Sequence, residues 1–323
     1  METLIVANKL SNTVSIIDTV SFRTIKEISV EDKPYEVVTS PDNKFALVSN
    51  FGDEKGKKPG NTLLVIDLFA EIVCGTIVLP VGSRPHGIKF VSDIIALVTV
   101  EGIQSLLSVN IVYLTACRIT VLPGKGARSV TVNASKKFAY VGNIESGSIC
   151  KVDMDTFTVV KEVKIGSSVE CVILTPDDTT ILVANGKDSS VSIINASNMM
   201  VTKVIKTDRK PVRLAMFNDG KSCAILNNGA GTVQIIDMNS MQITNTFVTT
   251  KIKSTRYGHF RGAVLSMPTN IIIRCDQVTA YISNFNAGNI TLVNLMTGEI
   301  VRTFEASDGP DGSDIYFSKK LNF

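Results

Sequence analysis

Short runs of apolar and β-branched residues alternate with turn residues along the whole chain. In its first occurrence the pattern covers residues 4–8, 13–18, 22–30 and 35–39, and Ser-Pro-Asp then begins a turn. Runs of this length bounded by Asn, Asp, Gly, Pro and Ser are typical of β-strands joined by tight turns. No convincing helical periodicity accompanies them. The pattern therefore predicts four strands in each copy and no helical layer.

The pattern recurs, and each copy is marked by an Asn that is followed at one fixed offset by Asp or Asn. The pairs are Asn8/Asp18, Asn143/Asp153, Asn185/Asn195, Asn227/Asp237 and Asn284/Asn294, together with Asn50/Asp67, which carries an insertion, and the degenerate copy Val100/Asn110. Successive copies begin roughly 42 to 57 residues apart, a period typical of propellers and other repeat architectures. Seven copies predict an all-β, seven-bladed β-propeller of four-stranded antiparallel blades, with residues 1–323 forming a single domain.

The first and last strands of the chain do not coincide with the boundaries of a repeat copy. The first copy begins at an Asn strand, whereas the last complete strand, residues 315–318, corresponds to the strand that precedes the turn. We therefore expect the last blade to be closed by N- and C-terminal strands together, which removes exposed sheet edges. We expect the recurring Asn side chains to bond backbone groups two residues on, and the recurring Asp to begin a hairpin.

Three stretches of the first copy carry a resemblance: Val-Ala-Asn at residues 6–8, Asn-Thr-Val-Ser-Ile-Ile-Asp-Thr at residues 12–19 and Ser-Pro-Asp-Asn-Lys at residues 40–44. They resemble the YVTN-type β-propeller repeat family, and the similarity extends over essentially the whole chain. The resemblance implies the propeller fold. It implies no single activity, because the same scaffold serves binding surfaces, surface-layer proteins and cofactor-enzyme subunits in that family.

Composition excludes several classes of function. The formal net charge is only +3 and no dense basic run is present, which argues against nucleic-acid binding. No apolar stretch is long enough for a membrane-spanning helix, and we expect no signal peptide at Met1–Leu4. The chain has no Trp, which excludes the tryptophan–aspartate type of propeller repeat. Six cysteines are scattered without a CxxC pair, as in a reduced compartment, so we expect a cytoplasmic protein.

Candidate chemistry appears where the copies differ. The strand that precedes the turn would line the axis, so residues at its start would meet around one mouth of the central channel. Aligning the copies gives a ring of unlike, mostly charged side chains: Glu36, His86, Arg128, Glu170, Arg213, Arg261 and Asp314, with Tyr35 beside Glu36. Packing alone favours similar small or apolar residues at equivalent places. Charges gathered in a concave mouth act strongly on a small ion.

The two histidines, His86 and His259, are both expected at this mouth. His259 lies in the irregular segment 249–262, a basic lobe that also contains Tyr257 and Arg261. The insertion 51–61 is a charged, glycine-rich loop expected on the same face, either as a lid, a partner contact or a solvated excursion. The turn at residues 267–279 is expected on the opposite face, and we assign it no role.

These features support three functional hypotheses. The first is a propeller that binds a small polar, anionic ligand or a partner segment, with Tyr35, Glu36, Arg128, Arg213, Arg261 and Asp314 as binding residues. The second is a lyase, isomerase or hydrolase with His86, His259, Glu170 and Tyr257 as catalytic residues at the same mouth. The third is a protein-interaction scaffold that leaves the mouth unused.

No cofactor is predicted. The two histidines with Glu170 or Asp314 could form a loose site for a divalent metal, although no metal-ligand spacing supports one. The oligomeric state is left open between a monomer and an unknown oligomer.

Overall fold

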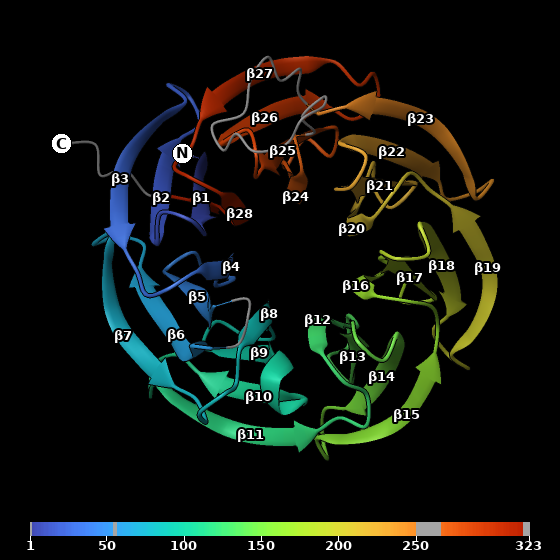
Figure 1. Cartoon of the computed structure of the whole chain (residues 1–323), viewed down its shortest axis with the longest axis horizontal. Helices are drawn as coiled ribbons and strands as arrows, with labels where there is room; N and C mark the ends of the chain where they lie inside the picture. Colours follow the sequence, from blue (N-terminus) through green and yellow to red (C-terminus); the bar gives the residue numbers. More distant parts are fainter. Residues whose placement is uncertain (1, 54–56, 250–265, 319–323) are drawn as a thin grey trace.

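Seven four-stranded antiparallel sheets surround a central channel as the blades of a β-propeller (Figure 1). The computed structural model describes residues 2–53, 57–249 and 266–318. The fold class predicted from the repeat is confirmed, including the number of blades and of strands in each blade.

The strands form four concentric layers. The innermost strands are β4 (Pro34–Thr39), β8 (Pro85–Phe90), β12 (Ala127–Val132), β16 (Val169–Leu174), β20 (Pro211–Phe217), β24 (Pro268–Ile273) and β28 (Pro310–Phe317). The second strands, most of which end on the recurring Asn, are β1 (Glu2–Asn8), β5 (Phe45–Gly52), β9 (Ile95–Val100), β13 (Phe138–Asn143), β17 (Thr180–Asn185), β21 (Ser222–Asn227) and β25 (Thr279–Asn284).

The outer half of each blade completes the layers. The third strands are β2 (Thr13–Asp18), β6 (Pro59–Asp67), β10 (Ser105–Asn110), β14 (Ser148–Asp153), β18 (Ser190–Asn195), β22 (Thr232–Asp237) and β26 (Asn289–Asn294). The outermost strands are β3 (Arg23–Ser29), β7 (Ile72–Val78), β11 (Thr115–Val121), β15 (Thr158–Lys164), β19 (Met200–Lys206), β23 (Gln242–Val248) and β27 (Ile300–Glu305). A single 3-10 turn, η1 (Glu101–Ile103), follows β9 among the described residues.

The ring closes as predicted. Strand β28 pairs with β1, so one blade takes its innermost strand from the C-terminal part of the chain and its other three from the N-terminal part (Figure 1). One prediction is wrong: residues 267–279 are not merely a turn, because they contain the innermost strand β24.

The apolar core lies between blades. Each of seven buried clusters joins neighbouring blades, as where Ile5 and Ile16 of one blade pack with Val48 and Ile66 of the next. The second strands are almost wholly buried, whereas an outermost strand such as β3 exposes nearly every residue. This gradient explains how a chain of alternating short strands buries enough apolar surface without a helical layer.

The recurring Asp and Asn have different roles. Asp18 accepts backbone N–H groups of Val20 and Ser21, so it begins the hairpin as predicted. The prediction for the recurring Asn is wrong in its partners. Asn185, for example, donates its side-chain amide to the hydroxyls of Ser190 and Ser192, at 3.3 and 2.8 Å, and so ties the second strand to the third.

The Asn bonds give a direct test of this arrangement. We expect Asn185→Ala to lower the free energy of unfolding by about 1–3 kcal/mol, because it leaves buried hydroxyl groups without their partner. Urea denaturation measures the loss. The control is Asn239→Ala on an exposed turn, which should change stability by less than about 0.5 kcal/mol. Equal stability of the two variants would contradict a structural role for the recurring Asn.

Candidate functional site

Every innermost strand begins with a β-bulge. In β12, Ala127 pairs with Asn143 and Ser129 with Gly142, so Arg128 is an extra residue without a ladder partner. Bulges re-aim side chains and occur often beside functional sites. Where the bulge frees a backbone N–H, the neighbouring second strand can supply a hydroxyl acceptor, as Thr99 does for Gly87 at 2.8 Å.

The bulges bring seven side chains to one cavity. A cavity of about 430 Å³ opens at this mouth of the channel, and all seven first bulge residues line it. They are Tyr35, His86, Arg128, Glu170, Val212, Thr269 and Asp311. Loops after the second strands and residues just before the innermost strands add Lys9, Leu10, Lys33, Lys210, Asn228, Met267 and Phe285, and Arg213 completes the lining.

Two of the predicted ring positions were aligned incorrectly. Asp311, not Asp314, takes the mouth position of β28. The carboxylate of Asp314 instead accepts the backbone N–H and hydroxyl of Thr39, both at 2.8 Å, and burial raises the pKa of Asp314 despite these bonds. The mouth position of β24 belongs to Thr269, not to Arg261. Arg261, Tyr257 and His259 lie outside the described residues.

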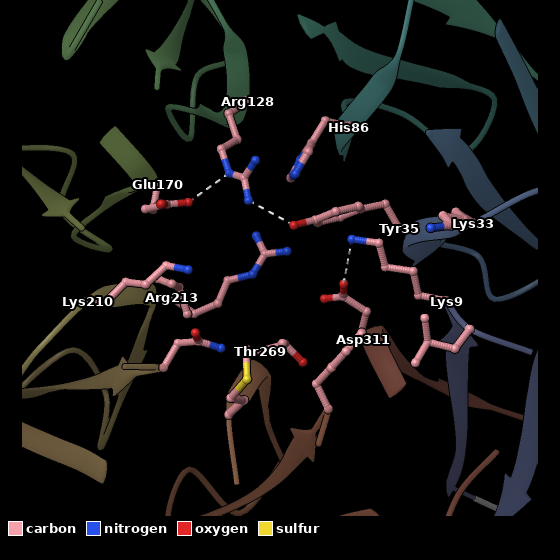
Figure 2. A pocket seen from close by; sticks show the side chains of 15 residues that line it. Lys9, Lys33, Tyr35, His86, Arg128, Glu170, Lys210, Arg213, Thr269 and Asp311 are labelled. Atoms are coloured by element: carbon pink, nitrogen blue, oxygen red, sulfur yellow. Dashed lines mark hydrogen bonds and ion pairs between the residues drawn. The ribbon is translucent and has the colours of Figure 1, made fainter. Parts of the chain in front are cut away.

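Arg128 is held by three groups. Its guanidinium donates to Glu170 at 2.9 Å and to the hydroxyl of Tyr35 at 2.8 Å (Figure 2). It also lies 3.5 Å from the carboxylate of Glu101. Burial by itself lowers the pKa of Arg128, but Tyr35, Glu170 and Glu101 outweigh it, so the net pKa is raised. Arg128 therefore stays charged inside the cavity wall.

His86 is buried without a hydrogen bond. The residue is only 2% exposed, its ring stacks on Tyr35 with centroids 4.0 Å apart, and neither ring nitrogen has a hydrogen-bond partner within the described residues. Burial lowers the pKa of His86 well below its ordinary value, and the charges of Arg128 and Lys9 lower it further. The imidazole is therefore neutral near pH 7.

An ion pair crosses the channel just inside the bulges. Arg213 of β20 donates to Glu36 of β4, and both are the second residue of their bulge. Figure 2 shows Arg213 reaching into the middle of the cavity. Burial lowers the pKa of Arg213, while Asp311 and Tyr35 raise it. The two predicted residues thus face each other, but the pairing between them could not be read from the alignment.

Lys9 and Asp311 complete the polar wall. Their charged groups are 3.9 Å apart and both residues are buried, and the Lys9 ammonium lies 4.1 Å above the ring of Tyr35 (Figure 2). Glu101, in η1, lies between Arg84 and Arg128, and burial raises its pKa although both arginines lower it. Sequence reasoning missed Lys9, Asp311 and Glu101.

The metal and membrane predictions can be compared only with the described part of the chain. Within residues 2–53, 57–249 and 266–318, no three His, Cys, Asp or Glu side chains gather closely enough to hold a metal ion. None of the helices found there could cross a membrane. The six cysteines all lie within these ranges and none forms a disulfide.

Fold and cavity define the class of protein: a seven-bladed β-propeller with a charged channel mouth. No model of a known protein family matches the chain, and no curated protein matches it. Among solved structures, the chain is similar to hydrazine synthase of Kuenenia stuttgartiensis, with 18% identity, a TM-score of 0.74, and coverage of 90% of this chain and 92% of that one. It is also similar to a functionally unknown protein of Desulfotomaculum acetoxidans, with 15% identity, a TM-score of 0.75, and coverage of 97% and 98%. Identities this low establish the fold alone.

The neutral, buried His86 makes stability depend on pH. Its pKa is depressed in the folded state, so as pH falls below about 6.5 the unfolded chain takes up a proton first. The stability that this imidazole contributes is therefore complete above about pH 6.5 and is lost as pH falls towards the folded-state pKa. We expect a slope of up to about 1.4 kcal/mol per pH unit from this group.

Denaturant unfolding of wild type and His86→Gln between about pH 7.5 and pH 5 measures this slope. The variant should lose it, whereas the control Lys26→Gln, on the exposed strand β3, should retain it. The buried carboxyls Glu101 and Asp314 act in the opposite direction because their pKa values are raised, but they are common to all three proteins. An unchanged slope in His86→Gln would contradict this account of His86.

Proposed function

We propose that the channel mouth binds a small polar, anionic molecule. The observation that carries this proposal is the excess of cations around one cavity: Lys9, Lys33, Arg128, Lys210 and Arg213 line it, against the carboxylates of Glu170 and Asp311. Glu36 and Glu101 offset part of this charge, and Arg84 adds to it. The local balance stays positive although the whole chain carries a formal charge of only +3.

The cavity has the properties that anion recognition requires. Its volume of about 430 Å³ lies within the range of small-molecule pockets. Buried walls of low dielectric strengthen the attraction between a fixed cation and an anion. Neutral His86, which lines the cavity, has one N–H donor and one acceptor nitrogen, both buried and without a protein partner in the described structure. Tyr35 and Thr269 add hydroxyl groups to the same wall.

The enzymatic alternative has less support. Glu170, its second acid–base group, is engaged by Arg128 at 2.9 Å, and Arg128 lies between Glu170 and His86 in Figure 2. His259 and Tyr257, its other catalytic candidates, lie outside the described residues. A protein-interaction scaffold would not require unlike side chains to converge on one cavity. Binding is therefore the function that the described residues support best.

Two finer assignments accompany this proposal. We assign the repeats to the YVTN type, because the recurring Asp begins the hairpin, as Asp18 does, and the recurring Asn joins the second strand to the third, as Asn185 does. We assign the protein to the cytoplasm, because all six cysteines are unpaired, as expected in a reducing compartment.

Anion binding should raise thermal stability. With phosphate, sulfate or citrate as probe, ligand at about 100 times its Kd should stabilise the wild type by about 2.7 kcal/mol. The double variant Arg128→Gln/Glu170→Gln removes the cation together with the carboxylate closest to it, while Arg84 remains beside Glu101, and it should lose most of the shift in Tm. Lys26→Gln, on the exposed strand β3, is the matched control and should respond like wild type. Absence of any shift in the wild type, or an unchanged shift in the double variant, would contradict the proposal.

A further inference from the structure

We propose that the ligand of this mouth is an organic dianion that carries one anionic group at each end. This inference rests on the proposed function and narrows it to a class of ligand. The observations behind it are the placement of two lysines on opposite walls and the nature of the surface between them.

Lys33 and Lys210 occupy the same position in two different blades. Each directly precedes the proline that begins an innermost strand, β4 or β20, and each lines the cavity. Both have a left-handed backbone, with φ of 55° and 58°, which fixes the direction in which each side chain leaves the strand. Figure 2 shows them on opposite sides of the cavity, in agreement with the positions of β4 and β20 on opposite sides of the channel in Figure 1.

The residues three positions further along β4 and β20 show how closely these two strands approach across the channel. Glu36 follows Lys33 on β4 and Arg213 follows Lys210 on β20 at the same spacing, and the side chains of Glu36 and Arg213 meet across the channel. The two lysines therefore lie on opposite walls, and each stands three residues before a member of the ion pair that crosses the channel. A ligand held by both must lie across the opening.

The two ammonium groups differ from the other cations of the wall. Arg128, Arg213 and Lys9 each have a carboxylate within 4.0 Å, whereas the side chains of Lys33 and Lys210 make no hydrogen bond or ion pair with the described residues. Lys33 is half-buried and Lys210 is exposed, so both ammonium groups are accessible, and a molecule with an anionic group at each end can pair with both of them. A single anionic group could neutralise only one of them.

The surface between the lysines suits a short hydrocarbon spacer. Leu10, Val212, Met267 and Phe285 line the cavity along with the charged groups, and Leu10 and Phe285 both approach Gly309 closely. Apolar contact with these side chains would stabilise a methylene chain, because burying CH₂ groups removes apolar surface from water. The spacing of the anionic groups should therefore determine affinity.

Isothermal titration of the full chain with unbranched dicarboxylates, from malonate to suberate, tests this inference, and monocarboxylates of matched length serve as controls. A parallel series of terminal diphosphonates distinguishes a carboxylate ligand from a phosphate-type ligand. We expect affinity to pass through a maximum at one chain length, where the dianion binds at least about tenfold more tightly than its monoanion. Lys33→Gln and Lys210→Gln should each reduce the dianion to the affinity of the monoanion, and Lys26→Gln should change nothing.

The outcomes separate this inference from the proposed function. The two-ended ligand would be ruled out if dianions and monoanions bound equally well, or if only one of the two lysine variants lost affinity for the dianion. Anion binding that depends on Arg128 would still support the proposed function in either case. Failure of phosphate, citrate and every member of both series to bind would overturn both.

Discussion

A β-bulge at the start of each innermost strand is the constraint on which the site depends. In an unbroken strand, neighbouring side chains alternate between faces, and a repeat would send its first residues into the gaps between blades. The extra residue turns one side chain per blade towards the axis and leaves the rest of the strand in register with the core. Ring closure by β28 and β1 supplies the seventh such side chain, Asp311. Backbone geometry therefore creates the cavity, whereas the identity of the seven side chains determines its chemistry.

The backbone before each bulge carries a cost. The residue that precedes each innermost strand has a positive φ, and only two of the seven are glycine: the set is Lys33, Arg84, Gly126, Ser168, Lys210, Met267 and Gly309. Side chains other than glycine are disfavoured in this conformation. Three of the five residues that are not glycine are basic, and they flank or line the cavity. This is expected if backbone strain is tolerated where it positions cations at the cavity. Buried partners such as Glu101 and Glu170 then keep the inner cations from destabilising the ring.

The repeat made the fold predictable, because the Asn and Asp positions report strands and turns that every blade needs. The site was predictable only where the copies stayed regular. Tyr35, His86, Arg128 and Glu170 follow well-formed turns and were placed correctly. Asp314 was aligned with the position that Asp311 holds, and Arg261 with the position that Thr269 holds, although Arg261 itself lies outside the described residues. Pro34, Pro85, Pro211, Pro268 and Pro310 each begin an innermost strand and would have placed Thr269 and Asp311 at the mouth. The pairing of Arg213 with Glu36 could not be predicted, because it depends on how far two side chains extend across the channel.

The separation of scaffold and mouth also explains why similarity to solved structures at 15% and 18% identity leaves the ligand undefined. The core clusters draw mostly on residues of the second and third strands, and the recurring Asn joins those same strands. The first bulge residues Val212 and Thr269 stand at positions equivalent to Arg128 and Glu170, so one backbone accepts apolar, polar, cationic and anionic side chains there. Blade packing places little restriction on that residue. The same ring can then be kept while its mouth is rebuilt for another ligand, so function must be argued from the seven side chains and not from the ring.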